Sequence, residues 1–178
     1  MRINGKGYIA SVIFLVVFAV VSLWKVKGNQ LLYQHNEGLI FGTVYHITYQ
    51  YSEDLQSEIN ALLKRFDKSL SPFNEESIIA AINRNDTAVR VDEYFKTVFS
   101  RSKEIYVASE GAFDPTVSPL INVWGFGFSK ADDITPFKID SLLQMVGMDK
   151  ISLLNGKVIK KDRRMTLNFS AIAKGYSC

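Results

Sequence analysis

The stretch GAFDPTVSPLINVWGFG, residues 111–127, combines three glycines and two prolines with three aromatic residues, and its only acid is Asp114. It contains neither histidine nor cysteine. Asp114 precedes Pro115, whose ring favours an extended backbone at the residue before it. The glycines allow sharp turns and let another group approach the main chain closely. We therefore predict a rigid loop with exposed backbone amides and little acid–base chemistry of its own.

Four aromatic side chains lie in or directly after this stretch, namely Phe113, Trp124, Phe126 and Phe128. Aromatic rings gain energy by stacking on another planar ring as well as by burial. The four rings therefore suit a flat heteroaromatic ligand with polar edges, and they equally suit packing in the core of the domain. Composition alone leaves both interpretations open.

Hydrophobic periodicity on both sides of the stretch predicts alternating helices and strands. Ser77 and Asp92 suit helix N-caps, Gly111 suits the left-handed position after a helix, and Asn155–Gly156 favours a tight hairpin turn. We predict strands at 43–51 and 164–170, a hairpin at 151–161, and helices at 55–70, 78–83, 92–110, 139–146 and from 170 onward. The fold class is therefore α+β, with a mixed or antiparallel sheet and packed helices.

The N-terminal region predicts a membrane segment. Tyr8–Trp24 carries no charged side chain, and its length is at the lower limit for a transmembrane helix, roughly 17–25 residues. We expect an uncleaved anchor, with a cleaved signal peptide and a buried core helix as alternatives. Basic residues precede the segment, which favours a domain on the extracytoplasmic side of the inner (cytoplasmic) membrane. Residues 1–28 then form the anchor or signal segment, 29–38 a polar connector, and 39–178 the domain.

Charge and residue content exclude several functions. The formal net charge is +3, but four basic side chains flank the apolar segment, so the body is nearly neutral and does not suit nucleic-acid binding. Cys178 is the only cysteine, so neither a disulfide framework nor a thiolate metal cluster is expected. The only histidines are His35 and His46. We expect His46 to be an ordinary strand residue on the face opposite Tyr45, with a Ser–His–Asp arrangement as the alternative.

The segment SAIAKGYS, residues 170–177, places Lys174 among small residues at the expected start of a helix. Backbone N–H groups and one ammonium group in such a segment can bind a phosphate. The segment lacks the glycine-rich pattern of a P-loop. A surface lysine without a ligand is the alternative interpretation.

Several motifs together resemble the ApbE family, the FAD:protein FMN transferases. They are FGTVY at 41–45, SPFNEES at 71–77, IN at 82–83, the stretch at 111–127, VG at 146–147 and SAIAKGY at 170–176. The resemblance implies an ApbE-like fold and a magnesium-dependent transfer of FMN from FAD to a threonine or serine, with release of AMP. The acceptor is a flavoprotein such as a subunit of a membrane redox complex. Positioning and charge neutralisation dominate such phosphoryl-type chemistry, which explains the lack of His and Cys in the loop.

The same resemblance assigns roles to individual residues. Ala112, Phe113 and Asp114 hold FAD, Lys174 contacts the flavin nucleotide, and the main-chain carbonyl of Ala171 ligates Mg2+.

Three assigned FAD contacts depart from the family pattern. Phe41 stands where relatives usually have Met, and Phe73 stands where they often have a Tyr that packs on the flavin. Asn168 stands where they commonly have an Asp that contacts FAD, so we expect the loss of that carboxylate to weaken nucleotide affinity.

The chain ends directly after the IAKGYS motif, whereas family members continue with a second half that carries acidic and hydroxyl metal ligands. The resemblance predicts that residues 1–178 are the N-terminal part of a membrane-anchored transferase and are poorly soluble and inactive by themselves. The alternatives are a natural truncation that binds flavin but does not transfer it, and a purely structural membrane-tethered domain. A coding sequence that continues past Cys178 with acidic metal ligands separates the enzyme from the natural truncation.

Overall fold

The computed structural model describes residues 12–22, 32–126 and 134–177. Contacts divide the chain into two compact units, the first formed by residues 1–37 and 46–55 and the second by residues 38–45 and 56–178. Phe128 and Cys178, which the sequence singles out, lie outside the described residues.

In the first unit, residues 12–22 are helical. Within the described ranges, no helix has both the length and the apolar character needed to cross a membrane. The expected span Tyr8–Trp24 begins and ends outside those ranges. The transmembrane helix therefore stays a prediction.

Two strands form a hairpin, β1 (Tyr33–Ile40) and β2 (Thr43–Gln50). A two-residue turn joins them, so the pair is antiparallel. The sequence predicts β2 correctly but does not predict β1, which begins at Tyr33 inside the stretch 29–38 that is expected to be a connector.

Polar side chains on the exposed face of the hairpin explain why β1 is not predicted. His35 Nδ1 lies 3.1 Å from Thr48 Oγ1, and His46 Nδ1 lies 3.3 Å from a carboxylate oxygen of Glu37. The polar residues of β1 thus have cross-strand partners, although their composition alone resembles that of a connector. His46 is exposed while its neighbour Ile47 is half-buried, which confirms the predicted alternation.

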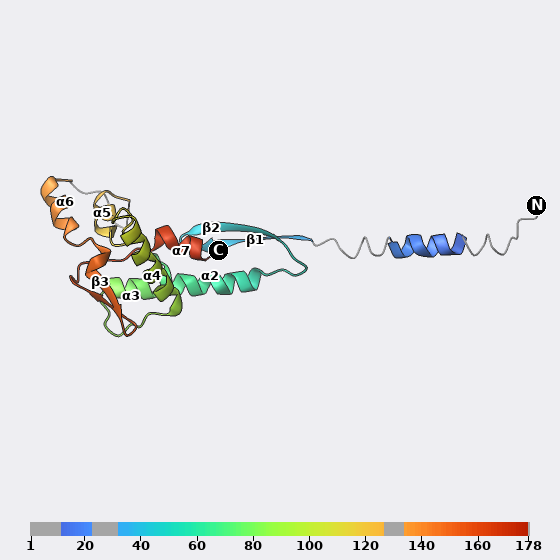
Figure 1. Ribbon diagram of the computed structural model, residues 1–178, viewed down its shortest axis with the longest axis horizontal. Helices are drawn as coiled ribbons and strands as arrows, with labels where there is room; N and C mark the ends of the chain where they lie inside the picture. Colours follow the sequence, from blue (N-terminus) through green and yellow to red (C-terminus); the bar gives the residue numbers. More distant parts are fainter. Residues whose placement is uncertain (1–11, 23–31, 127–133, 178) are drawn as a thin grey trace, which may run out of the picture. The chain divides into compact units, whose positions relative to one another are not determined.

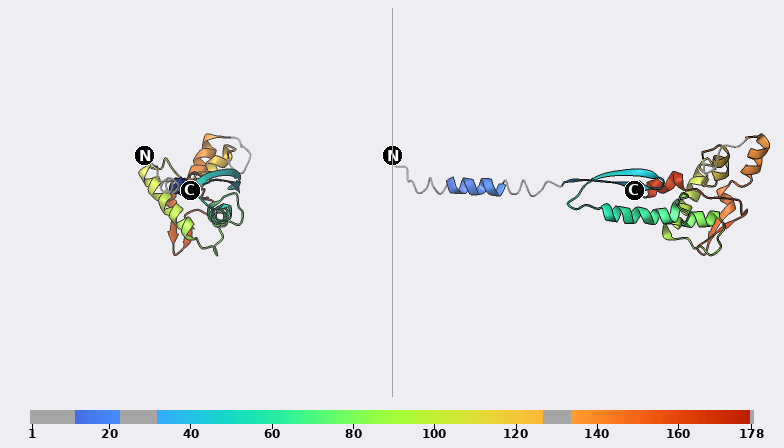
Figure 2. Two further views of the ribbon diagram at one scale, coloured as in Figure 1. Left: turned by 90° about the vertical axis from the view of Figure 1, so that its right-hand side faces the viewer. Right: turned by 180° about the vertical axis from the view of Figure 1, so that it is seen from behind.

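The second unit carries most of the helices and a second hairpin. The helices are α2 (Gln56–Leu70), α3 (Ile78–Asn83), α4 (Glu93–Ala108), α5 (Ser118–Val123), α6 (Pro136–Leu143), the short 3₁₀ helix η1 (Met148–Lys150) and α7 (Ser170–Tyr176). Strands β3 (Ile151–Leu154) and β4 (Lys157–Lys160) pair antiparallel. α7 lies beside α2 and contacts α4 (Figures 1 and 2). The α+β class is confirmed.

Local signals in the sequence set several element boundaries as predicted. The side chains of Ser77 and Asp92 each accept a hydrogen bond from the backbone N–H three residues later, which caps α3 and α4. Gly111 follows α4 with φ 85°. Asn155 and Gly156 have φ values of 51° and 73°, the left-handed conformation that a tight type I′ hairpin turn requires.

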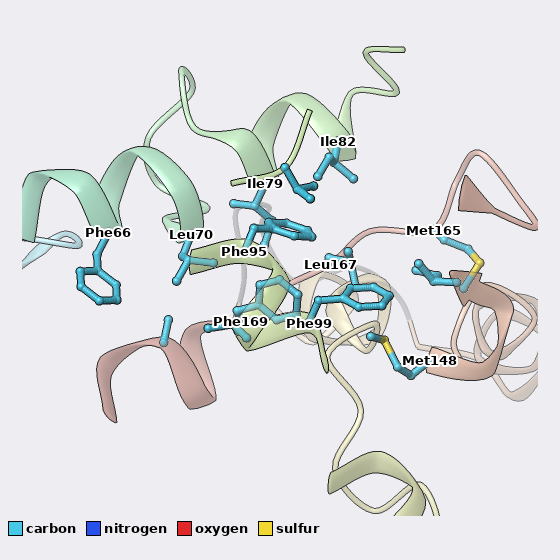
Figure 3. Close-up of a cluster of buried hydrophobic side chains, with 14 of the residues drawn as sticks. Phe66, Leu70, Ile79, Ile82, Phe95, Phe99, Met148, Met165, Leu167 and Phe169 are labelled. Atoms are coloured by element: carbon cyan, nitrogen blue, oxygen red, sulfur yellow. The ribbon is translucent and has the colours of Figure 1, made fainter. Parts of the chain in front are cut away.

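The core of the second unit is built around Phe95 of α4. Its ring meets that of Phe169 edge-on, with centroids 5.3 Å apart, and both side chains are fully buried. Figure 3 shows Leu70, Ile79 and Leu167 in the same cluster. Residues from α2, α3, α4 and the segment before α7 therefore share one core.

The strand predicted at residues 164–170 does not form. Met165, Leu167 and Phe169 are buried while their neighbours are more exposed, so the hydrophobic period is two, as in a strand. The backbone finds its partners elsewhere, because the amide of Asn83 bonds to both N–H and C=O of Leu167. Residues 165–169 thus alternate in burial as a strand does, but they belong to no sheet.

Two further differences concern the middle of the chain. The stretch 111–127 contains a short helix, α5, where the sequence predicts only loop. Pro119 lies in its first turn, a position where proline is tolerated because that N–H has no helical partner. α6 ends at Leu143, whereas the sequence extends this helix to residue 146.

Candidate functional site

A cavity of about 250 Å3 in the second unit collects three segments that are far apart in the sequence. Its lining comprises Phe41 and Gly42 of the β1–β2 turn with Thr43 at the start of β2, Leu70 at the end of α2 with Ser71, Pro72 and Phe73 after it, and Ser170, Ala173 and Lys174 of α7. Each segment contributes one residue to which the sequence assigns an FAD contact: Phe41, Phe73 and Lys174. The structure thus brings these three together.

The hairpin turn presents Phe41 to the cavity. Phe41 and Gly42 have φ values of 54° and 71°, and a left-handed backbone is uncommon for an aromatic residue and costs energy. Phe41 also packs against the hydrophobic core. A Cβ added at Gly42 would lie 3.8 Å from the ring of Phe73, so the turn and that ring are close neighbours.

Phe73 offers the cavity a largely exposed ring, with 60% of its surface accessible. The loop that carries it is fixed by hydrogen bonds, since Ser77 Oγ donates to Ser71 O at 2.7 Å and Asn74 Nδ2 donates to Asp67 Oδ2 at 2.6 Å. An exposed aromatic ring on a fixed loop suits stacking on a flat ligand.

Helix α7 supplies the positive charge at the cavity. Ala173 is buried in the core, which fixes the helix, while Lys174 and Ser170 are exposed and line the cavity. The helix begins at Ser170, as the sequence predicts. An ammonium group at the edge of a cavity with aromatic walls suits a ligand that joins an aromatic ring to an anionic group.

Asp114 belongs to a separate hydrogen-bonded loop. Its Oδ1 accepts bonds from Thr116 N–H at 2.8 Å and from Thr116 Oγ1 at 2.6 Å. Thr116 Oγ1 in turn accepts a bond from Gly147 N–H at 2.7 Å. The sequence missed Thr116 and its role here, although it lies two residues after Asp114 in the quoted stretch.

Asn168 joins this loop to α7. Its backbone N–H donates to Pro115 O at 2.8 Å, and its Oδ1 accepts from Ser170 N–H at 2.9 Å. The residues assigned to FAD therefore fall into two groups linked through Asn168: the cavity group, and the loop of Asp114.

Like Asp114 and Asn168, three further assigned residues do not line the cavity. Ala112 is exposed, Phe113 is half-buried with its N–H bonded to Ser109 Oγ, and Ala171 is exposed on α7. No cluster of three or more His, Cys, Asp or Glu side chains suited to a metal ion occurs in the described part of the chain. The metal role that the resemblance gives to Ala171 stays a prediction.

The aromatic residues at the end of the stretch do not pack in the core. Trp124 and Phe126 are exposed, so the core interpretation is wrong for both. They also lie outside the cavity lining.

Tyr106 lies near two carboxylates, those of Asp149 and Asp114. Its hydroxyl donates to Asp149 Oδ1 at 3.2 Å. Burial raises the pKa of Tyr106, and the negative charges of Asp149 and Asp114 raise it further. Asp114 and Asp149 thus both lie close enough to Tyr106 to disfavour its ionised form.

Comparison with known proteins identifies the family. The model of the ApbE family matches residues 41–178. The chain belongs to the ApbE family. The FAD:protein FMN transferase of Haemophilus influenzae is 31% identical over 155 residues, covering 78% of this chain and 45% of that protein. The FAD:protein FMN transferase of Vibrio cholerae is 28% identical over 152 residues, covering 80% of this chain and 46% of that protein.

Solved structures of the family confirm the ApbE-like fold. The flavin transferase ApbE from Vibrio cholerae superposes with a TM-score of 0.75 at 27% identity, covering 82% of this chain and 50% of that one. The apo flavinyl transferase ApbE from Pseudomonas stutzeri gives a TM-score of 0.72 at 25% identity, covering 83% and 52%. The chain spans about half the length of the curated relatives it matches.

Proposed function

We propose that this chain provides the FAD-binding part of an FAD:protein FMN transferase. In the proposed reaction a threonine or serine oxygen of an acceptor flavoprotein bonds to the phosphorus of the FMN half of FAD. The P–O bond to AMP breaks, AMP leaves, and the hydroxyl proton is lost. Curated relatives named FAD:protein FMN transferase, at 31% and 28% identity, support the proposal.

One observation carries the proposal. Phe41, Phe73 and Lys174 come from three distant parts of the chain and line one cavity. FAD combines a flat ring system with a doubly charged pyrophosphate, and this cavity combines an exposed aromatic ring with an ammonium group. The chemistry of the lining fits the chemistry of the ligand.

Each residue has a distinct task in this proposal. The Phe73 ring stacks on the isoalloxazine, and Phe41 closes the adjacent wall. Lys174 binds the pyrophosphate as a point charge. Asp114 accepts a hydrogen bond from an N–H or O–H of FAD, and Asn168 holds the Asp114 loop against α7. None of these residues is assigned the proton transfer.

Magnesium dependence is also part of the proposal, through the resemblance that assigns Ala171. Mg2+ prefers near-octahedral oxygen coordination with help from carboxylates. The described residues do not provide such a set around α7. We therefore assign no step of the reaction to the ion.

We further propose that the N-terminal segment holds the domain at the extracytoplasmic side of the inner membrane, near an acceptor in a membrane redox complex. The support is the uncharged stretch Tyr8–Trp24, which is helical over residues 12–22. Cell fractionation tests this. The full chain is expected in the membrane fraction, and its presence in the soluble fraction with an intact N-terminus would contradict the proposal.

A chimera tests the transfer activity. Residues 41–178 replace the matching part of the Haemophilus influenzae relative, and the chimera is incubated with FAD, Mg2+ and an acceptor that the parent labels. We expect covalent flavin fluorescence on the acceptor band in a denaturing gel, and a strongly reduced signal for the Lys174→Gln chimera. A folded chimera that binds FAD but labels no acceptor would refute the proposal.

A further inference from the structure

Thr116 is fully buried, and its hydroxyl forms hydrogen bonds with Gly147 and Asp114. Gly147 N–H donates to Thr116 Oγ1 at 2.7 Å, and Thr116 Oγ1 lies 2.6 Å from Asp114 Oδ1. Pro115, between Asp114 and Thr116, is buried as well. The side chain therefore joins the Asp114 loop to the turn after α6.

The chemistry of these groups fixes the direction of the chain of hydrogen bonds. A backbone N–H only donates, so Gly147 makes Thr116 Oγ1 an acceptor and leaves the hydroxyl proton for another partner. An ionised carboxylate only accepts, and Asp114 Oδ1 is that partner. The proton of Thr116 thus points at Oδ1.

In this arrangement the two carboxylate oxygens of Asp114 differ in their hydrogen bonding. Oδ1 receives two donors, the N–H and the O–H of Thr116. Within the described residues no hydrogen bond reaches Oδ2, and the side chain is half-exposed. Two donors on one oxygen hold the plane of the carboxylate, so Oδ2 keeps one orientation.

The turn that supplies the Gly147 donor is closely packed and has hydrogen bonds of its own. Gly147 has φ 135°, and a Cβ added there would lie 2.6 Å from Asp149 Oδ1 and 3.2 Å from the Lys150 side chain. Lys150 Nζ also donates to Val146 O at 2.6 Å. The position of the Gly147 N–H is therefore set by the turn and not by Thr116.

We propose that Thr116 is a positioning residue for FAD binding. Its buried hydroxyl accepts a hydrogen bond from Gly147 N–H and donates one to Asp114 Oδ1, and these two bonds orient the carboxylate so that Oδ2 accepts a hydrogen bond from FAD. The inference rests on the proposed function, because Asp114 needs FAD as its partner. It adds a residue that touches no ligand and acts through Asp114.

A double-mutant cycle on FAD affinity tests the inference in the full chain. Thr116→Val removes the hydroxyl at nearly constant shape, and Thr116→Ser keeps it. Each is measured alone and with Asp114→Ala, by titration of FAD fluorescence, and thermal unfolding is recorded for every variant. We expect Thr116→Val to weaken FAD binding about tenfold, in line with loss of a hydrogen bond to a charged group. Thr116→Ser should stay within about twofold of the parent, because the oxygen keeps both bonds.

The cycle separates positioning from general stability. If Thr116 acts through Asp114, Thr116→Val has no further effect on FAD affinity once Asp114→Ala is present. The inference is overturned if Thr116→Val weakens FAD binding equally with and without Asp114→Ala. It is also overturned if Thr116→Val leaves the FAD affinity of the parent chain unchanged. Should Thr116→Val fail to fold, the cycle is run with Thr116→Ala under the same criteria. Absence of FAD binding by the parent chain overturns the proposed function as well, whereas normal binding by Thr116→Val overturns the inference alone.

Discussion

Asn83 is the residue whose replacement tests the packing beneath the site most sharply. Its Nδ2 donates to Leu167 O at 2.9 Å, and its Oδ1 accepts from Leu167 N–H at 2.8 Å. Leu167 is only 1% exposed. The side chain of Asn83 thus replaces a neighbouring strand for the segment that leads into α7.

The cost of Asn83→Ala follows from these two bonds. Each net hydrogen bond contributes about 1 kcal/mol, and each buried group left without a partner costs about 1–3 kcal/mol. Asn83 is itself half-buried, so water can reach part of the vacated space. We expect the free energy of unfolding to fall by about 2–4 kcal/mol.

Urea denaturation followed by circular dichroism measures this loss. Gln144→Ala is the matched control, because Gln144 has an exposed side-chain amide and should change stability by no more than about 0.5 kcal/mol. A loss below about 0.5 kcal/mol for Asn83→Ala would show that the segment before α7 is held by packing alone.

The substitution Asn83→Asp should make the free energy of unfolding depend on pH. The introduced carboxylate accepts from Leu167 N–H but repels Leu167 O, whereas its protonated form can donate as the amide does. The pKa of the introduced group in the folded protein should therefore lie above the unfolded value of about 4. Its contribution to stability is then present below that unfolded value and is lost as the pH rises through the raised folded pKa.

Two predictions concern the second hairpin and the turn after it. The bidentate contact with Arg164 lowers the pKa of Asp162 from 3.8 to about 2, so its contribution to stability is present above pH 3.8 and is lost as the pH falls through about 2. NMR titration should show the pKa returning toward 3.8 in Arg164→Gln, and an unchanged low pKa would refute the role of Arg164. Gly156→Ala should lower the free energy of unfolding by about 1–2 kcal/mol, because φ is 73° while the added Cβ meets no atom closer than 3.8 Å. Thermal unfolding checks this, and a neutral effect would contradict the conformational cost.

Local signals predicted those parts of the fold that local chemistry determines. Ser77 and Asp92 cap their helices because each side chain reaches an N–H three residues away, and no distant part of the chain is needed. The same holds for Asn155–Gly156, whose conformation is set within the turn.

The errors arose where distant residues supply the partners. Residues 164–170 have the period of a strand, but Asn83 and Pro115 occupy the backbone groups that a strand would pair. β1 was missed because its polar residues are paired across the hairpin.

The candidate site shows the same division. The motifs pointed to Phe41, Phe73 and Lys174, but their meeting at one cavity depends on contacts across the unit. Thr116 gave no signal of its own, since a threonine after a proline shows nothing of the backbone N–H that it binds.

Titration of FAD with the full chain tests the central claim most directly, that FAD binds at the cavity of Phe41, Phe73 and Lys174. The parent, Phe73→Ala and Phe137→Ala are compared by FAD fluorescence, and Phe137 is the control because it is an exposed phenylalanine of α6 away from the cavity. We predict that the parent binds FAD, that Phe73→Ala binds about tenfold more weakly through loss of stacking and burial, and that Phe137→Ala binds as the parent does. No binding by the parent, or equal affinity for Phe73→Ala and the parent, would contradict the account.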